Sequence, residues 1–432
     1  MSSLSAASVT PARRVAFVVL RRVFEQGAFA DRALHAEAAD LDPRERAFAT
    51  ALTYGAVQRR GTLDHLIGRW SSRPLPKLDP PVVAALRLGL FQLLFMDGVA
   101  THAAVNESVE LVKREGKGGA QLVNALLRRA TREGADWLAG LSDADPASAA
   151  LLHSVPDWLA ELWWRELGET EARALLGGVN EPAESALRVN PLVASAQEVL
   201  DALPVAARRA DAPPEAIVLD GSFDAFSSGL FARGAIMPQS RGSMTVARAL
   251  SPTPGARVLD LCAAPGGKTT HLAALMRDEG EVVAVDRHPG RAAALERTCE
   301  RMHTGCVRVL VADAAELPGA TESFSFVLVD PPCSGLGTLQ SRPDLRWRVR
   351  PESIMELGAL QARILTAGAA ALAPGGALVY SVCTISRAEG DGVIDAFLSS
   401  NPEFVATERR QLLPHRDGTD GFFIARLHRR TR

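Results

Sequence analysis

The segment Asp330-Pro331-Pro332-Cys333-Ser334-Gly335 places a carboxylate and a thiol three residues apart, directly after an apolar run. The two prolines restrict the backbone there, so we expect the acid and the thiol to be held at fixed positions. A second thiol, Cys383, follows another apolar run that ends in Tyr380-Ser381. A thiolate is suited to adding to an electron-poor ring carbon, and a second base is needed where a proton must leave that ring.

Methylation of carbon 5 of cytosine requires this set of groups. That carbon is a poor nucleophile until a thiolate adds to carbon 6 and an acid stabilises the ring nitrogen. The resulting enamine can attack a methyl sulfonium, after which a base removes the proton from carbon 5 and the first thiol leaves. Asp330, Cys333 and Cys383 supply one acid and two thiols. The residue types leave open which thiol is the nucleophile.

A turn with two glycines, Cys262-Ala263-Ala264-Pro265-Gly266-Gly267-Lys268, follows the run that ends at Asp260 and opens a predicted helix. Its small residues would let the backbone approach a ligand at the N-terminus of that helix. A phosphate-binding P-loop is excluded because Cys262 stands where that motif needs glycine, and the G-x-G-x-x-G pattern of a dinucleotide turn is absent. The remaining alternative is a glycine-rich turn without a ligand.

Asp286 and Asp313 end the next two apolar runs. A carboxylate at such a position can accept hydrogen bonds from the hydroxyls of a ribose, although either residue alone could equally be a helix N-cap. Together with the glycine turn they predict a nucleoside-containing cofactor. The pattern indicates S-adenosylmethionine more than a redox dinucleotide.

Short β-branched runs alternate with helix-like segments after residue 254 and predict buried parallel strands. These strands are expected at 257–260, 281–286, 307–313, 326–330 and 377–381. Such alternation predicts a Rossmann-like, doubly wound α/β sheet, in which ligands bind beyond the carboxyl ends of the strands. The residues singled out above would therefore meet at one edge.

Three domains are predicted for the 432 residues. Apolar residues recur at helical spacing in the first part, which predicts an all-α domain over 11–140. Helical and extended pieces mix over 150–240, which we interpret as a small α+β module, and the α/β domain takes 241–432. Positive charge is in slight excess only over residues 1–140.

The composition, 47% hydrophobic and 23% charged, is typical of a folded globular protein and excludes wholesale disorder. The five cysteines follow no secretory signal, so we expect thiols in a reducing cytoplasm. The longest apolar stretch, 82–96, contains Arg87 and is too short to cross a bilayer, so no membrane association is expected. No C-x-x-C pair or suitable histidine spacing occurs, and we expect no metal. Cys299 and Cys306 are interpreted as inert core residues.

These motifs resemble the RNA 5-methylcytosine methyltransferases of the RsmB/Sun (Fmu) type, which modify small-subunit ribosomal RNA in bacteria. The resemblance rests on 260–268, 330–335, 380–384 and the chain end 420–427. It implies S-adenosylmethionine-dependent methylation of carbon 5 of a 16S rRNA cytosine, with Cys383 as nucleophile and Cys333 assisting release. A monomer is expected, but the sequence does not determine the oligomeric state. The residues it places around the cofactor are Cys262, Ala263, Ala264, Pro265, Gly266, Gly267, Lys268, Asp286, Asp313 and Asp330.

The first domain is similar to NusB, an RNA-binding helical bundle, through 86–89, 102–107 and 123–129. The middle module is supported by Leu187-Arg188-Val189-Asn190. Two positions depart from the family pattern. Val382 stands where threonine is frequent, and Ser240 follows Gln239 where aspartate is usual.

Arginines 342, 346, 348 and 350 surround Trp347 and predict a surface for single-stranded RNA beside the site, with an ordinary exposed loop as the alternative. We expect the target base to be flipped out of its stack. Two other functions are weighed, a non-catalytic RNA-binding factor and a DNA cytosine methyltransferase. The presence of Asp330, Cys333 and Cys383 argues against the first, and the NusB-like domain argues against the second. The sequence leaves open which cytosine is modified and whether free rRNA or an assembled particle is the substrate.

Overall fold

The computed structural model describes residues 9–116, 118–317 and 323–431. Its contacts divide the chain into two compact units. Unit 1 comprises Met1–Glu181 and Leu339–Arg348, and unit 2 comprises Pro182–Thr338 and Val349–Arg432. Each unit is described by itself.

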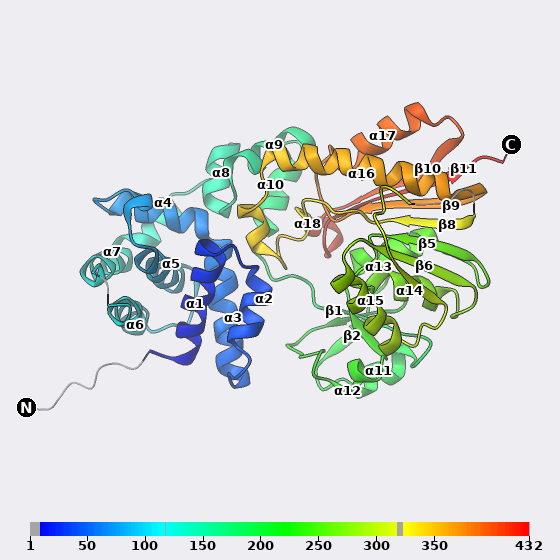
Figure 1. Ribbon diagram of the computed structural model, residues 1–432. Coiled ribbons are helices and arrows are strands. Elements are labelled where there is room, and N and C mark those ends of the chain that lie inside the picture. The colour runs from blue at the N-terminus through cyan, green and yellow to red at the C-terminus, as the bar shows by residue number, and fades with distance from the viewer. Residues whose placement is uncertain (1–8, 117, 318–322, 432) are drawn as a thin grey trace, which may run out of the picture. The chain divides into compact units, whose positions relative to one another are not determined.

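Unit 1 is helical throughout its described residues (Figure 1). Its α-helices are α1 (Pro11–Glu25), α2 (Ala30–Glu37), α3 (Pro43–Gln58), α4 (Arg60–Trp70), α5 (Pro80–Phe95), α6 (Thr101–Arg114), α7 (Ala120–Ala139), α8 (Pro146–His153), α9 (Asp157–Leu167) and α10 (Glu169–Gly178). Two 3-10 helices, η1 (Leu75–Lys77) and η2 (Pro343–Trp347), complete it.

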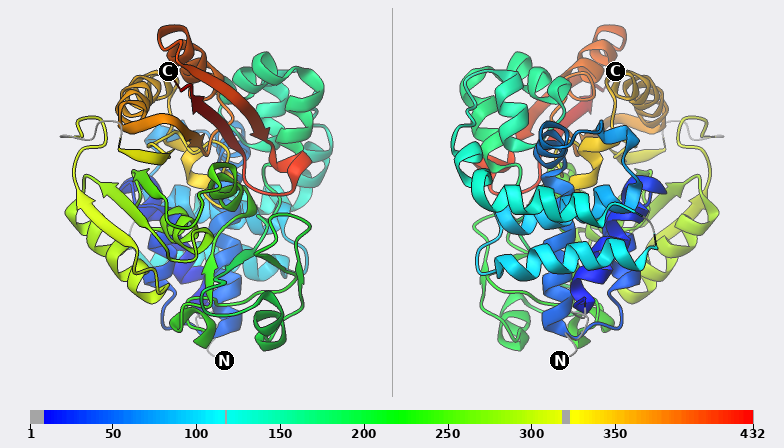
Figure 2. Two further views of the ribbon diagram at one scale, coloured as in Figure 1. Left: turned by 90° about the vertical axis from the view of Figure 1, so that its right-hand side faces the viewer. Right: turned by 90° about the vertical axis from the view of Figure 1, so that its left-hand side faces the viewer.

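Helix α5 is the centre of the bundle. Pro80 and Pro81 fit its first turn, where a backbone N–H has no helical partner to lose. Its apolar side chains are buried on all sides because α1, α3, α4, α6 and α7 contact it. Helices α6 and α7 also lie against each other, as the right view of Figure 2 shows in cyan. The predicted all-α architecture is confirmed.

Unit 2 begins with a small antiparallel sheet in the order β2-β3-β1-β4. The strands are β1 (Ala186–Val189), β2 (Ala207–Arg209), β3 (Ala216–Leu219) and β4 (Ile236–Pro238), with helices α11 (Ala196–Ala202) and α12 (Gly229–Ala232). Residues Ala186 and Leu187 of β1 pair with Val218 and Ile217 of β3. This sheet is the extended part of the α+β module predicted from the sequence. Helices α8, α9 and α10, of which the last two fall wholly within the predicted range of this module, belong to unit 1 by their contacts. They pack on one another, and α8 packs on α4.

A seven-stranded sheet in the order β10-β11-β9-β8-β5-β6-β7 forms the rest of unit 2. Strands β5 (Arg257–Leu261), β6 (Glu281–Asp286), β7 (Val307–Val311), β8 (Phe324–Val329) and β9 (Leu372–Val382) are parallel, whereas β10 (Phe404–Leu412) and β11 (Phe422–Arg429) are antiparallel additions. Its helices are α13 (Arg241–Leu250), α14 (Gly267–Leu275), α15 (Pro289–Arg301), α16 (Pro351–Ala371), α17 (Asp391–Ser400) and α18 (Pro414–Asp417). The predicted Rossmann-like sheet is confirmed.

Alternate residues of the central strands face two cores. In β5, Val258 packs with α13 and α14, whereas Leu259 and Leu261 pack with α16. Helices therefore cover both faces, with α16 on one side and α13, α14 and α15 on the other (Figure 1). Burial on both faces explains why these strands are continuous apolar runs in the sequence. No described helix is both long and apolar enough to span a bilayer.

Candidate active site

The carboxyl ends of five parallel strands bring the predicted site residues to one edge of the sheet. Leu261 of β5 is in register with Val285 of β6 and with Val329 of β8. Val329 is in register with Tyr380 of β9. Asp286 ends β6 and Asp330 follows β8. Both are consequently neighbours of the glycine turn after β5. The site is built within unit 2.

The two thiols lie in contact at this edge. The sulfur atoms of Cys333 and Cys383 are 3.2 Å apart, although fifty residues separate them in the chain. Gly337 holds the two loops together, because its N–H donates to the carbonyl of Cys383 at 3.0 Å. A Cβ on Gly337 would lie 2.0 Å from the carbonyl oxygen of Gly421, so this approach requires glycine. The prediction that both thiols reach one place is met by the geometry.

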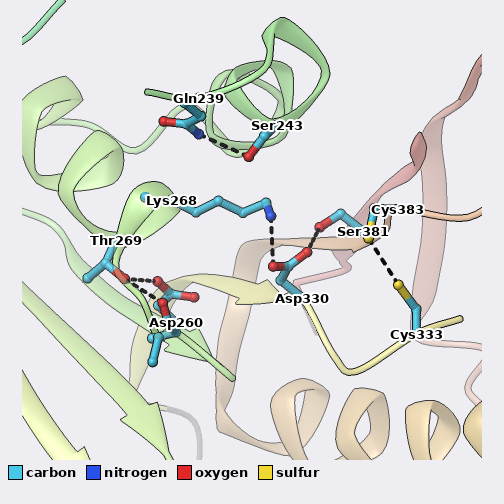
Figure 3. A network of polar contacts seen from close by, with 12 residues as sticks. Gln239, Ser243, Asp260, Lys268, Thr269, Asp330, Cys333, Ser381 and Cys383 are labelled. Carbon is cyan, nitrogen blue, oxygen red and sulfur yellow. Dashed lines mark hydrogen bonds and ion pairs between the residues drawn. The ribbon is translucent and has the colours of Figure 1, made fainter. Parts of the chain in front are cut away.

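Asp330 connects the glycine turn to the thiol loops. One of its carboxylate oxygens accepts from the Lys268 ammonium at 2.7 Å, and the other accepts from the Ser381 hydroxyl at 2.7 Å (Figure 3). Burial disfavours the charge on Lys268, but Asp330 and the nearby Cys383 outweigh it and raise the lysine pKa above its ordinary value. The Lys268 ammonium is also 5.3 Å from the centre of the Phe422 ring. A fixed cation therefore lies beside the acid and the Cys383 sulfur.

The hydrogen bond with Cys383 and burial hold the pKa of Cys333 well above its ordinary value, and the charges of Cys383 and Glu389 act in the same direction. Cys333 is consequently held in its protonated form beside the Cys383 sulfur.

The glycine turn fits a close ligand approach. Gly266, at the start of α14, has φ of 103°, a conformation that L side chains rarely adopt. A Cβ there would lie 2.7 Å from Leu295 of α15, so the turn packs tightly against that helix. Cys262 has its pKa raised to about 12 by burial and by the charges of Asp330, Asp260 and Asp286. It is consequently a poor nucleophile, and the turn is surrounded by acids.

Asp260 is a residue of this site that the sequence analysis did not assign. Its side chain is 1% exposed, and one oxygen accepts from the Thr269 hydroxyl at 2.6 Å (Figure 3). The other oxygen is buried and has no hydrogen-bond partner among the described residues. Burial raises the pKa of Asp260 to about 7, although the Thr269 hydrogen bond opposes the shift. The position of Asp260 at a strand end, next to the glycine turn, was the signal available.

Asp286 and Asp313 differ in their surroundings. Asp286 is buried, accepts from the backbone N–H of His288 at 3.0 Å and lies 3.3 Å from the Arg291 guanidinium. Asp313 is exposed and accepts from the backbone N–H of Ala315 at 2.9 Å, which stabilises a local turn. Asp286 is thus fixed at the edge of the site, whereas Asp313 stabilises a turn and is not the N-cap of any described helix.

Arg188 from β1 supports the glycine turn from below and was also missed. It is fully buried, and it donates to the carbonyl of Gly267, to the Thr270 hydroxyl at 2.7 Å and to the Gln239 amide oxygen at 2.9 Å. Burial lowers the pKa of Arg188 to about 9. The small sheet thereby fixes the first turn of α14.

The two departures from the family pattern leave this geometry intact. The Ser240 hydroxyl accepts from the backbone N–H of Ser243 at 3.4 Å and caps α13, a role that aspartate also fills. Val382 is fully buried in the core of β9, where it pairs with Phe423 of β11. An apolar residue is compatible with that place.

The predicted RNA surface around Trp347 is wrong for Arg346, which lies in the interior of unit 1, whereas Trp347 and Arg348 are half-buried. Arg346 is fully buried and donates to carbonyl oxygens of Ser154, Val179 and Leu339 and to Asn180. The indole N–H of Trp347 donates to the carbonyl of Val57 at 2.7 Å. Arg348 is paired with Asp344 at 2.7 Å. Most of the carbonyl oxygens that accept from Arg346 and Trp347 belong to residues distant in sequence, so a local charge pattern could not distinguish these contacts from phosphate contacts. Arg342 and Arg350 are exposed.

In the described part of the chain, no group of three or more histidine, cysteine or acidic side chains is placed to hold a metal ion. All five cysteines are present as thiols rather than disulfides.

Three family models match successive parts of the chain. Residues 10–132 match the NusB family, residues 155–225 match the ferredoxin-like domain of RsmF/B-like methyltransferases, and residues 247–428 match the 16S rRNA methyltransferase RsmB/F. The ferredoxin-like match covers strands β1, β2 and β3 of the small sheet and helices α9 and α10 before it, but not strand β4.

Relatives that align over nearly the whole chain support the same family. A probable ribosomal RNA small subunit methyltransferase B from Synechocystis sp. is 37% identical over 96% of this chain and 99% of its own length. Ribosomal RNA small subunit methyltransferase B from Thermus thermophilus is 37% identical, with 89% of each chain covered. The crystal structure of the protein PH0851 superposes with a TM-score of 0.82 at 28% identity, over 98% of this chain and 100% of that one. The chain belongs to the RsmB/F family of 16S rRNA methyltransferases.

Proposed function

We propose that this protein uses S-adenosylmethionine to methylate carbon 5 of a cytosine in small-subunit ribosomal RNA, through a covalent bond between Cys383 and the base. One observation carries the proposal: the Cys333 and Cys383 sulfurs lie 3.2 Å apart beside the Lys268–Asp330 ion pair. The names of the curated relatives support ribosomal RNA as the polymer.

The edge of the sheet fits this cofactor. S-adenosylmethionine carries an ammonium and a sulfonium, and when bound it supplies an electrophilic methyl group. The buried, unpartnered oxygen of Asp260 is a suitable acceptor for the ammonium, because an unsatisfied buried carboxylate oxygen is costly without a ligand. We assign the ribose hydroxyls to Asp286 and the remaining contacts to residues 262–268, Asp313 and Asp330.

Cys383 attacks first. Its thiolate, which the Lys268 charge favours, forms a bond to carbon 6 of the base. The electron pair of the carbon 5–carbon 6 double bond moves through carbon 4 to nitrogen 3. The Lys268 ammonium supplies a proton through the Asp330 carboxylate, to which it is hydrogen-bonded, and the carboxylate passes this proton to nitrogen 3. Carbon 5 then has the electron density to take the methyl group.

Cys333 completes the reaction. Its raised pKa arises first from the hydrogen bond with Cys383, and that cause disappears once the Cys383 sulfur is bonded to carbon. The pKa of Cys333 therefore falls in the adduct, so Cys333 loses its proton to solvent and becomes a thiolate that can act as the base. The Cys333 thiolate takes the proton from carbon 5, the ring double bond forms again as the sulfur–carbon 6 bond breaks, and Cys383 leaves as a thiolate. Nitrogen 3 returns its proton through Asp330 to Lys268.

A denaturing gel tests the proposal. Purified wild type, Cys333→Ala and Cys383→Ala are each mixed with unmodified small-subunit rRNA and S-adenosylmethionine, with Cys306→Ala as a matched thiol control and single-stranded DNA as a second substrate. We expect a denaturation-resistant band to accumulate in Cys333→Ala and to be absent in Cys383→Ala. The reverse pattern exchanges the two thiols. A band with DNA alone would refute rRNA as the substrate, and no adduct or methyl transfer with any polymer would refute the mechanism.

A further inference from the structure

Glu389, seven residues after the end of β9, is a fully buried carboxylate that the reaction above does not use. One of its oxygens accepts from the backbone N–H of Ser334 at 2.8 Å and from the Gln361 amide at 3.1 Å. The other accepts from the hydroxyls of Ser334 and of Thr384, the latter at 3.0 Å. The donors that the structure gives it are all neutral groups.

The bonded residues are the immediate neighbours of the two thiols. Ser334 follows Cys333, and Thr384 follows Cys383. Their hydroxyl oxygens are also 2.8 Å from each other. A single carboxylate therefore ties together the two loops whose relative placement sets the distance between the sulfurs.

A second layer holds the carboxylate in place. The amide of Gln361, on α16, donates to the carbonyl of Pro332 at 2.9 Å as well as to Glu389. The Tyr380 hydroxyl lies 2.6 Å from the Glu389 carbonyl oxygen and 3.1 Å from the Gln361 amide oxygen. The network is rigid because each member has at least two partners within the core of unit 2.

Burying a carboxylate among neutral donors costs free energy. A buried carboxylate is therefore expected where its capacity to accept several hydrogen bonds is needed. Only a carboxylate offers two oxygens that accept from a backbone N–H, an amide and two hydroxyls together. We propose that Glu389 is a positioning residue that fixes the separation of the two catalytic thiols, so that Cys333 lies against carbon 5 while Cys383 is bonded to carbon 6. This inference rests on the function proposed above.

The test compares Glu389→Ala and Glu389→Gln with Glu408→Ala, which removes an exposed carboxylate from β10. The first readout is independent of catalysis: a trivalent arsenical, phenylarsine oxide, binds two thiols only when they are close together. Cys333→Ala and Cys383→Ala provide the background from the other cysteines. We expect Glu389→Ala to bind the arsenical at least about tenfold more weakly than Glu408→Ala, and Glu389→Gln, which keeps one acceptor oxygen, to lie between them.

The second readout separates adduct formation from release. We expect kcat of Glu389→Ala to fall by about 10- to 100-fold with the KM for S-adenosylmethionine unchanged, because a displacement of about 1 Å is enough for such a loss. The covalent complex should accumulate, since release depends on the placement of Cys333. If Glu389→Ala does not fold, the same criteria apply to Glu389→Gln.

Arsenical binding and release rates equal to those of Glu408→Ala in a folded Glu389 variant would overturn the inference. Should the wild type form no adduct with any RNA, the proposed function fails by itself. The thiol spacing reported by the arsenical then decides the role of Glu389 alone.

Discussion

Replacing Asp260 by asparagine should stabilise unit 2 at alkaline pH while weakening cofactor binding. Burial raises the pKa of this carboxyl from 3.8 to about 7. Because the pKa in the folded protein lies above that in the unfolded chain, the folded state retains a proton that the unfolded chain has lost. The free energy of unfolding therefore falls as the pH rises from about 4 to about 7.

The size of the effect follows from the shift. A shift of about three pKa units corresponds to about 4 kcal/mol over the whole window, most of which falls between pH 5 and pH 8. Asp260→Asn keeps an oxygen that can accept from Thr269 but does not titrate. The stability of the variant minus that of the wild type should thus rise by about 3 kcal/mol from pH 5 to pH 8.

Hydrogen exchange of the β5 and β6 amides, corrected for intrinsic rates and measured without cofactor, reports the stability of unit 2. All six tryptophans lie in unit 1, at positions 70, 137, 158, 163, 164 and 347, so their fluorescence during urea unfolding is an internal control that should not change. Glu408→Gln, which removes an exposed charge on β10, is the matched variant and should give a pH-independent difference.

Calorimetry supplies the second half of the prediction. Loss of a charge-assisted hydrogen bond to the cofactor ammonium should weaken S-adenosylmethionine binding by about 10- to 100-fold. A stability difference that is the same at pH 5 and pH 8 would show that Asp260 is already ionised in the folded protein at pH 5, and the reasoning from burial would be refuted. Unchanged cofactor affinity would remove Asp260 from the binding site.

Three further outcomes are expected. Arg188→Met removes the donors to the Gly267 carbonyl while keeping an apolar side chain of similar length. Calorimetry should show the Kd for S-adenosylmethionine raised by about tenfold. An unchanged affinity would count against a role of Arg188 in positioning the glycine turn. Gly337→Ala places a Cβ 2.0 Å from the Gly421 carbonyl oxygen, so the Cys333 loop must move. Methyl transfer should fall by more than about tenfold, while the unfolding of unit 1 followed by tryptophan fluorescence stays the same. Full activity would contradict the geometry. Arg346→Met leaves buried carbonyl oxygens without donors. It should lower the free energy of unfolding of unit 1 by about 3 kcal/mol, measured by urea unfolding followed by tryptophan fluorescence. A loss below about 1 kcal/mol would mean that water donates to these carbonyl oxygens instead.

The sequence by itself determined the catalytic sheet and the residues at its edge. Strands β5, β6, β8 and β9 are buried on both faces, so each is an apolar run that can be read without knowing its neighbours. Parallel strands end at one edge, and this topological rule was enough to bring Asp286, Asp330 and both thiols together. Strand β10 was not foreseen, because its side chains are mostly exposed at the end of the sheet and carry charges rather than an apolar run.

Tertiary structure alone decided how the side chains are partnered. The 3.2 Å between the two sulfurs, the unpartnered oxygen of Asp260 and the four hydrogen bonds of Glu389 all depend on atoms from different loops. Arg346 is a further example. Its position among charged residues in the sequence predicted an exposed RNA-binding surface, whereas in the structure it is buried and donates to carbonyl oxygens from residues 154–180. A sequence specifies which groups are charged or reactive and where strands run. It does not specify which desolvated donor meets which acceptor, since that depends on long-range packing.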